Sequence, residues 1–91
     1  MQFEWDESKS AKNLEKHGLK LPDGALVFDD PNRKDYIDER ADYGEDRMIT
    51  IGLGADKVLY VCWTERKDDI IRLISVRPAT KQEQRIYNGD S

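Results

Sequence analysis

The sequence predicts an α+β fold, in which an antiparallel sheet is backed by two N-terminal helices and followed by a short C-terminal helix. Three observations predict this class. Residues 47–76 contain three apolar runs with the spacing of neighbouring strands. The N-terminal third of the chain instead has helical spacing and helix-end signals. A Thr-x-x-Glu sequence at 80–83 has the form of a capping box, which opens a helix.

The N-terminal segment is predicted to form a short strand and then a helix. Phe3 and Trp5 occupy alternate positions in the stretch QFEW, which indicates a strand. Asp6 or Ser8 suits the N-cap of the helix, and Gly18 suits the position after its C-terminus. The expected inner face carries Ala11 and Leu14, and the expected outer face carries Lys9, Lys12, Asn13 and Lys16.

The middle of the chain is predicted to hold a second short helix and an edge strand. Leu21–Phe28 is largely apolar and has Pro22 in its first turn, where proline is tolerated. The sequence DDPN at 29–32 ends this helix. Residues 34–38 then form a weak edge strand within a polar segment.

The second half is predicted to form the centre of the sheet and the last helix. Arg47–Leu53 alternates, Lys57–Thr64 is nearly continuously apolar, and Ile70–Val76 is the last strand. The short stretches GADK and ERKDD connect these strands as hairpin turns. The final helix begins near Thr80 and reaches about Tyr87.

Chain length and charge limit the class of protein. The 91 residues suit one domain over residues 1–91. The one cysteine excludes an intramolecular disulfide, and the N-terminus lacks an apolar signal segment, so we expect a cytoplasmic protein. The net charge of −4 argues against general nucleic-acid binding. However, residues 47–91 carry 8 Lys/Arg and 6 Asp/Glu, so a local anion site is compatible with the acidic whole.

Several common kinds of site have no matching motif. His17 and Cys62, 45 residues apart and without spaced partners, make no zinc motif. The sequence contains no EF-hand, P-loop or dinucleotide-binding pattern. We therefore expect neither a metal nor a cofactor.

Arg77, at the end of the last strand, is the clearest candidate for an anion site. By alternation it shares a face with three residues of its strand, Ile71, Leu73 and Ser75. Pro78 holds the backbone of Arg77 extended, and the first N–H groups of the following helix favour an anion nearby. A guanidinium can bind a phosphate through two hydrogen bonds. The alternative is that Arg77 pairs with Glu83 or with a carboxylate of the first helix.

His17, the only imidazole, is the candidate for proton transfer near neutral pH. It could act as an acid or a base, or it could simply donate to a carbonyl of the last helical turn. The lysines beside it on the helix are most simply a solvated face.

Longer stretches resemble a known family. FEWDESKSAKNLEKHGL (3–19), LVFDDP (26–31), DERADYGEDRMITIG (38–52), VLYVCWTER (58–66) and IRLISVRPATKQEQRIY (71–87) follow one another as in the BrnT toxins of type II toxin–antitoxin systems. The most specific parts are the opening F-E-W-D…K…N…K-H-G and the closing I-S-x-R-x-A-T…E…Y. The resemblance covers nearly the whole chain.

The resemblance implies a fold like that of RelE-type ribonucleases, metal-independent RNA cleavage and inhibition of translation. It also implies neutralisation by a BrnA-type antitoxin, which would carry the DNA-binding part. Attack by the ribose 2′-OH would place charge on the phosphate, which Arg77 and Arg66 would hold. His17 and Tyr87 would transfer the protons. Further RNA contacts are expected from four basic residues, Arg85, Lys81, Arg47 and Lys16.

Two positions depart from the pattern that the resemblance implies. Pro78 stands where the family often has a basic residue, and Val76 replaces a usual small residue. Pro78 removes a phosphate contact and stiffens the strand exit. A second hypothesis is therefore a catalytically weak or inactive protein that acts as a co-repressor through its antitoxin. A third is an RNA-binding protein that does not cleave.

Overall fold

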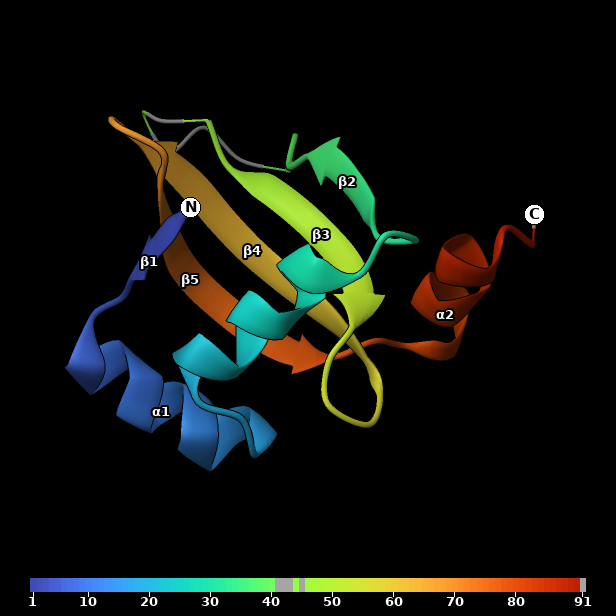
Figure 1. Ribbon diagram of the computed structural model, residues 1–91. Coiled ribbons are helices and arrows are strands. Elements are labelled where there is room, and N and C mark those ends of the chain that lie inside the picture. Colours follow the sequence, from blue (N-terminus) through green and yellow to red (C-terminus); the bar gives the residue numbers. More distant parts are fainter. Residues whose placement is uncertain (41–43, 45, 91) are drawn as a thin grey trace.

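One sheet organises the molecule. The computed structural model describes residues 1–40, 44 and 46–90, and within them five strands form a sheet in the order β1-β5-β4-β3-β2 (Figure 1). The strands are β1 Gln2–Glu4, β2 Lys34–Ile37, β3 Met48–Leu53, β4 Val58–Arg66 and β5 Ile70–Pro78. The helices are α1 Glu7–His17, the 3₁₀ helix η1 Leu21–Asp29 and α2 Lys81–Asn88. The expected α+β class is confirmed.

The pairing of the strands is mixed. β2, β3, β4 and β5 pair antiparallel, as expected from the sequence. β1 instead pairs parallel with β5, with Gln2 opposite Ile70 and Glu4 opposite Arg72. Parallel neighbours need a long crossover connection, and here the whole chain between them supplies it. The first strand therefore lies beside the last one.

α1 begins and ends where the sequence predicts, and η1 ends at Asp29, one residue beyond the predicted Phe28. The side chain of Asp6 caps α1 by accepting from the backbone N–H groups of Ser8 and Lys9, and Gly18 ends it in the left-handed region at φ 74°. Gly24 lets η1 approach the sheet closely, because a Cβ there would lie 2.6 Å from a methyl carbon of Val76. None of the helices in the described part of the chain is long and apolar enough to cross a membrane.

The prediction of which face of α1 is buried was wrong. Ala11 and Leu14 are exposed, whereas Ser10 and Asn13 are buried. The Asn13 amide donates to the carbonyl of Val76 (2.8 Å), and its oxygen accepts from the Val76 N–H (3.2 Å). Because β1 covers only the first part of β5, Asn13 completes the hydrogen bonding of that edge where β1 has ended. A polar contact, rather than an apolar stripe, therefore sets the orientation of the helix.

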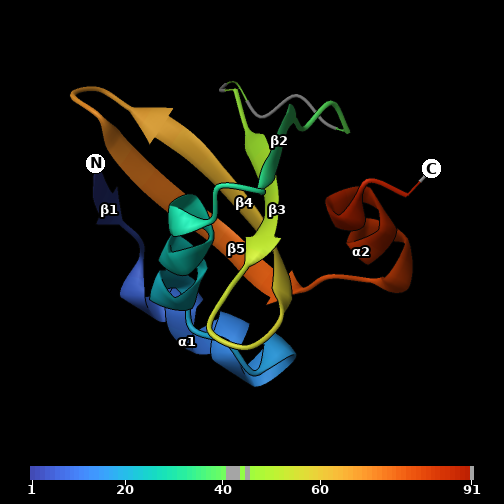
Figure 2. The ribbon, with the colours of Figure 1, turned by 45° about the vertical axis from the view of Figure 1, so that its right-hand side comes forward.

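Buried side chains of the described residues form a cluster on each face of the sheet. The cluster beneath η1 consists of Leu21, Val27, Leu59, Val61, Ile71, Leu73 and Val76. The cluster on the opposite face consists of Ile49, Ile51, Tyr60 and Cys62, with Val58, Ile74 and Tyr87 packed against it. α2 flanks this second face (Figure 2). The predicted capping box of α2, between Thr80 and Glu83, is confirmed.

An irregularity in β5 overturns the predicted alternation. Cys62 pairs with Ser75, but its neighbour Trp63 pairs with Leu73, so one residue, Ile74, is left over. Beyond this bulge Ser75 and Arg77 lie opposite residues of the second cluster, while Leu73 belongs to the first. Of the three residues expected on the same face as Arg77, only Ser75 lies there, and Ile71 and Leu73 lie on the other face.

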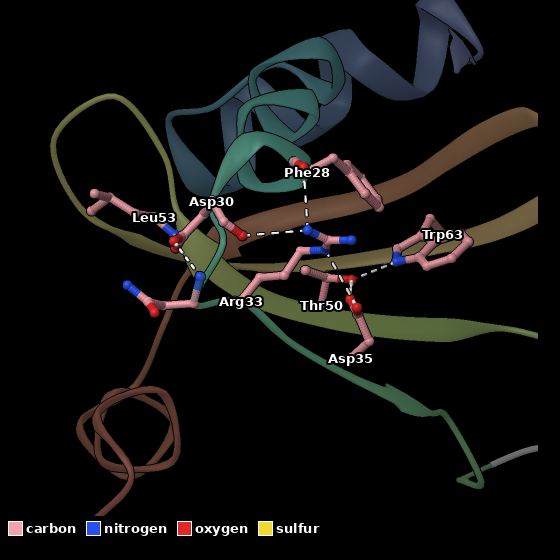
Figure 3. A network of polar contacts seen from close by, with 8 residues as sticks. Phe28, Asp30, Arg33, Asp35, Thr50, Leu53 and Trp63 are labelled. Carbon is pink, nitrogen blue, oxygen red and sulfur yellow. Dashed lines mark hydrogen bonds and ion pairs between the residues drawn. The ribbon is translucent and has the colours of Figure 1, made fainter.

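A polar network fastens the edge strand β2 to the rest of the sheet (Figure 3). The guanidinium of Arg33 donates to the carbonyls of Phe28 and Asp30 (both 3.3 Å) and pairs with Asp35. The hydroxyl of Thr50 donates to Asp35 and accepts from the indole N–H of Trp63 (2.8 Å). η1, β2, β3 and β4 are thus linked by one chain of contacts on the side of the sheet that η1 covers.

Candidate functional site

Arg77 lies on the second face with its guanidinium over an aromatic ring. Its central carbon is 3.9 Å from the ring centroid of Tyr60, the residue opposite it in the sheet. Its two terminal nitrogens donate to the two carboxylate oxygens of Glu83, at 2.8 and 2.9 Å. One of these nitrogens also donates to the Pro78 carbonyl (3.2 Å). The pairing of Arg77 with Glu83, which the sequence left open as the alternative, is therefore the observed one.

This pair stays ionised. Hydrogen bonds to Glu83 raise the pKa of Arg77 above its already high ordinary value. Burial opposes ionisation of Glu83, but hydrogen bonds from Arg77 and from the Thr80 N–H outweigh it and lower the pKa of the Glu83 carboxyl. Glu83 is therefore a weak base, and its negative charge occupies the face of Arg77 that an external anion would use.

Residues around the pair add aromatic and cationic groups that the sequence did not single out. The Arg40 guanidinium lies 5.9 Å from the Tyr60 centroid and forms a two-point pair with buried Asp38 (2.8 and 3.0 Å). Burial raises the pKa of Tyr60, and also raises the pKa of Tyr36 to about 12, so both phenols are neutral. Tyr60 was hidden within the apolar run VLYVCW, because the register that sets it opposite Arg77 cannot be predicted from sequence.

A basic groove runs between α1 and β5. It consists of two adjoining hollows of about 210 and 110 Å³, which share Lys9 and Ile74. Its basic lining residues are Lys9, Lys12, Lys16, His17, Arg47 and Arg72. Asp6 also lines it, as the cap of α1, and Arg72 pairs with Glu4 at 2.8 Å. Cations exceed carboxylates along the groove, so its electrostatic potential favours an anionic chain.

The groove leads to Arg77. Ser75 lines its wider hollow, and Arg77 is the next residue along β5 on the same face of the sheet. The Cα atoms of two such residues are about 7 Å apart along a strand. The structure therefore brings together His17, Lys16 and Arg47 in the groove and sets Arg77 just beyond it.

The other predicted site residues lie elsewhere. Arg66 ends β4, six residues beyond Tyr60 and hence roughly 20 Å from it along the strand. Lys81 and Arg85 are exposed on α2. The hydroxyl of Tyr87 donates to the Asp30 carboxylate (2.6 Å), and this bond raises the pKa of the phenol. These four side chains do not share the groove.

The described residues contain no group of three or more His, Cys, Asp or Glu side chains placed to hold a metal ion. Cys62 is buried in the second cluster. The chemistry available at the groove is therefore that of guanidinium and ammonium groups, which bind anions, together with one imidazole that can transfer a proton.

A family model of the ribonuclease toxin BrnT, of type II toxin–antitoxin systems, matches residues 5–83. The chain belongs to the BrnT family. The matched segment contains His17, the other lining residues of the basic groove, Arg77 and Glu83, and it ends before Arg85 and Tyr87. The family resemblance found in the sequence is therefore confirmed.

A solved structure gives the same result. The crystal structure of the Brucella abortus ribonuclease toxin BrnT is similar to this chain, with a TM-score of 0.69 and 26% sequence identity. The match covers 89% of this chain and 99% of that one. Comparison with curated proteins gave no match. As a BrnT-family ribonuclease toxin, the protein acts on RNA and has an antitoxin as its partner.

Proposed function

We propose that this BrnT-family toxin is an endoribonuclease that cleaves RNA by attack of a ribose 2′-OH on the adjacent phosphorus, without a metal ion. The observation that supports it is the basic groove, which holds the imidazole of His17 among lysines and leads to Arg77. In this reaction negative charge accumulates on the phosphate oxygens. Preorganised cations stabilise that charge, so guanidinium and ammonium groups can supply the main electrostatic contribution.

Each step can be given to a residue in the groove or to Arg77 beside it. The 2′-oxygen forms a bond to phosphorus while the bond to the 5′-oxygen breaks, leaving a 2′,3′-cyclic phosphate and a 5′-hydroxyl. One proton leaves the 2′-OH and another reaches the 5′-oxygen, and His17 is the residue that we propose for proton transfer. Arg77 holds the reacting phosphate, and Lys16 and Arg47 hold neighbouring phosphates.

The remaining predicted residues take other roles in this proposal. Tyr87 positions α2 through Asp30, because its hydroxyl already donates to that carboxylate. Arg66 lies too far along β4 to share a phosphate with Arg77, so we propose it as a contact to RNA outside the cleavage site. Lys81 and Arg85, exposed on α2, are proposed as contacts of the same kind.

The proposed partner is an antitoxin of the BrnA type. DNA would be contacted only indirectly, through that antitoxin. The proposed location is the cytoplasm, since cleavage that halts translation has to reach RNA in use by ribosomes. These three statements extend the family's description as toxins of type II systems.

A second candidate function is favoured by the pairing of Arg77 with Glu83. If RNA cannot displace Glu83, the protein is catalytically weak and acts as a co-repressor through its antitoxin. Pro78, beside this pair, has no basic side chain with which to compensate. The two functions differ in whether the free protein cleaves RNA.

The deciding experiment incubates the purified free protein with bulk RNA in EDTA without ribosomes, and separately with messenger RNA on ribosomes in the Mg²⁺ buffer that ribosomes need. Wild type is compared with Arg77→Ala and His17→Gln, and Lys34→Ala, an exposed cation on the edge strand β2, is the control. We expect fragments with 2′,3′-cyclic phosphate ends from wild type and Lys34→Ala, and far fewer from the other two variants. Intact RNA in both conditions, from wild type that melts cooperatively, would refute the endoribonuclease and favour the co-repressor.

A further inference from the structure

A second groove lies between η1 and the hairpin that joins β3 to β4. It is formed by two adjoining hollows of about 420 and 210 Å³ that share Leu26 and Ala55. In both ribbon views the hairpin loop lies next to η1 (Figure 1, Figure 2). The basic groove, by contrast, lies between α1 and β5.

The floor of this second groove is apolar and unusually exposed. Leu26 on η1 and Leu53 at the end of β3 are 45% and 46% exposed, and both line the larger hollow. Leu19 and Leu59 line the smaller one. Large aliphatic side chains that gather in a concave surface, instead of being scattered singly, mark a place where another molecule binds.

The rim of the groove is acidic. Asp29 borders the larger hollow, Asp23 and Asp56 border the smaller one, and Lys57 is the one cation among the lining residues that the structure describes. Asp30 also lines the groove, but its carboxylate accepts from the Leu53 N–H and the Tyr87 hydroxyl and serves the fold. The rim therefore repels RNA and attracts a positively charged partner.

We propose that this groove is a docking site for the antitoxin, and that it binds an amphipathic helix with two apolar side chains one turn apart, flanked by Lys or Arg. Two adjoining hollows suit two anchors on one helical face. The acidic rim suits basic flanking residues. An antitoxin partner is already required by the family, so the proposal does not depend on how this toxin cleaves RNA.

Separate grooves for RNA and for the antitoxin have a consequence for neutralisation. The second groove, called the acidic groove because of its rim, adds to the affinity of the antitoxin, and RNA does not compete for it. Only the remainder of the antitoxin has to reach the basic groove, and tethering raises its effective concentration at that site. Substitutions in the acidic groove therefore weaken antitoxin binding while leaving RNA cleavage by the free toxin unchanged.

The test measures the affinity of the purified toxin for its purified cognate antitoxin by calorimetry. One variant, Leu26→Ser with Leu53→Ser, makes the floor of the groove polar. Another, Asp29→Lys with Asp56→Lys, reverses the charge of its rim. Controls are Leu14→Ser, a leucine of similar exposure (42%) on α1, and Glu15→Lys beside it. Thermal melting and RNA cleavage by each free variant verify the fold.

We expect both groove variants to lose at least tenfold in affinity and both controls to stay within twofold of wild type. Wild-type affinity in the leucine variant would overturn the docking site. Stronger binding by the charge-reversal variant would show an acidic partner segment and overturn the stated chemistry. The free toxin is also examined by sedimentation, and a wild-type dimer that the leucine variant abolishes would mean that a second copy of this chain occupies the groove.

Discussion

The carboxylate of Glu83 holds the guanidinium of Arg77 through two parallel hydrogen bonds of 2.8 and 2.9 Å. A phosphate would bind Arg77 in the same two-point way. The guanidinium also lies over the ring of Tyr60, with its central carbon 3.9 Å from the ring centroid. The arginine is therefore positioned by the sheet as well as by its ion-pair partner. If Arg77 binds a phosphate of RNA as proposed, that phosphate would have to compete with Glu83 for the same guanidinium.

Replacing Arg77 tests the proposed phosphate contact. We expect Arg77→Ala to lower the rate of RNA cleavage by about 10²–10³, the usual effect of removing one donor to a developing oxyanion. Arg77→Lys keeps the positive charge but cannot donate two parallel hydrogen bonds to one phosphate, so its rate should lie between those of the alanine variant and wild type. Single-turnover cleavage of a short RNA measures both. A rate within threefold of wild type for the alanine variant would remove Arg77 from the mechanism.

Neutralising Glu83 tests whether it competes with RNA. Glu83→Gln keeps the shape of the side chain but removes its charge. A partly exposed ion pair is worth about 1 kcal/mol, so RNA should bind about fivefold more tightly. Thr80→Ala is the matched control, because it removes the other half of the capping box and leaves the Glu83 carboxylate in place. Weaker RNA binding by Glu83→Gln in a filter-binding titration would mean that Glu83 aims Arg77 at the substrate.

His17 and Lys16 are neighbours at the end of α1, yet they should fail in different ways. We expect His17→Gln to slow cleavage by about 10²–10⁴ with little change in RNA affinity. Lys16→Ala should mainly weaken RNA binding and lower the slope of its salt dependence by about one. Cleavage rates at saturating RNA, together with binding at several salt concentrations, separate the two effects. The assignment fails if both variants change affinity and rate alike.

Asn13 should contribute strongly to stability. Asn13→Ala leaves the buried N–H and carbonyl of Val76 without their side-chain partner, which lowers the free energy of unfolding by about 1–3 kcal/mol. Leu14→Ala, on the exposed side of the same helix, should change it by no more than about 0.5 kcal/mol. Urea denaturation measures both variants. Equal losses would mean that the apolar face predicted from the sequence matters after all.

Tyr87→Phe should change how stability depends on pH. The hydrogen bond from Tyr87 is the main cause that lowers the pKa of the Asp30 carboxyl below its ordinary value of 3.8, although burial opposes it. Because the pKa of Asp30 is lower in the folded state than in the unfolded state, its ionised form adds to the free energy of unfolding. This contribution is fully present above pH 3.8, the ordinary pKa, and is lost as the pH falls through the lowered pKa of the folded state. We expect wild type to exceed Tyr87→Phe by about 1–2 kcal/mol at pH 7 and by less at pH 3. An equal difference at both pH values, measured by denaturation, would contradict this link.

Local signals in the sequence predicted most of the elements. The Asp6 cap, Gly18 and the Thr80–Glu83 capping box act within one turn of the chain, so their effect can be predicted without the fold. The strands β3, β4 and β5 followed from apolar runs for the same reason. The expected ends of β4 and β5 were two residues short, because strand pairing continues through polar residues that no apolar pattern marks.

Contacts between distant segments were not predictable. The bulge at Ile74 reverses the alternation after it, and so moved Arg77 to the other face of the sheet. Asn13 looked like a surface residue until its partner, the edge of β5, was known. The basic groove is lined by residues of both α1 and β5. Tyr60 contacts Arg77 because the two residues are opposite each other on the neighbouring strands β4 and β5. Each depends on register and packing, which one sequence does not reveal.

The parallel pairing of β1 with β5 affects when the protein can become active. Gln2 and Ile70 are opposite each other although they are 68 positions apart in the chain. Folding that depends on contacts of such long range is slow, because a long loop has to be closed before they form. The basic groove likewise needs His17 from the beginning of the chain and Ser75 from near its end. We expect a partly synthesised chain on the ribosome to be harmless to the messenger that encodes it, with activity arising only after β5 has emerged and folded. Such a delay would give the antitoxin an interval in which to bind the new chain before it can cleave RNA.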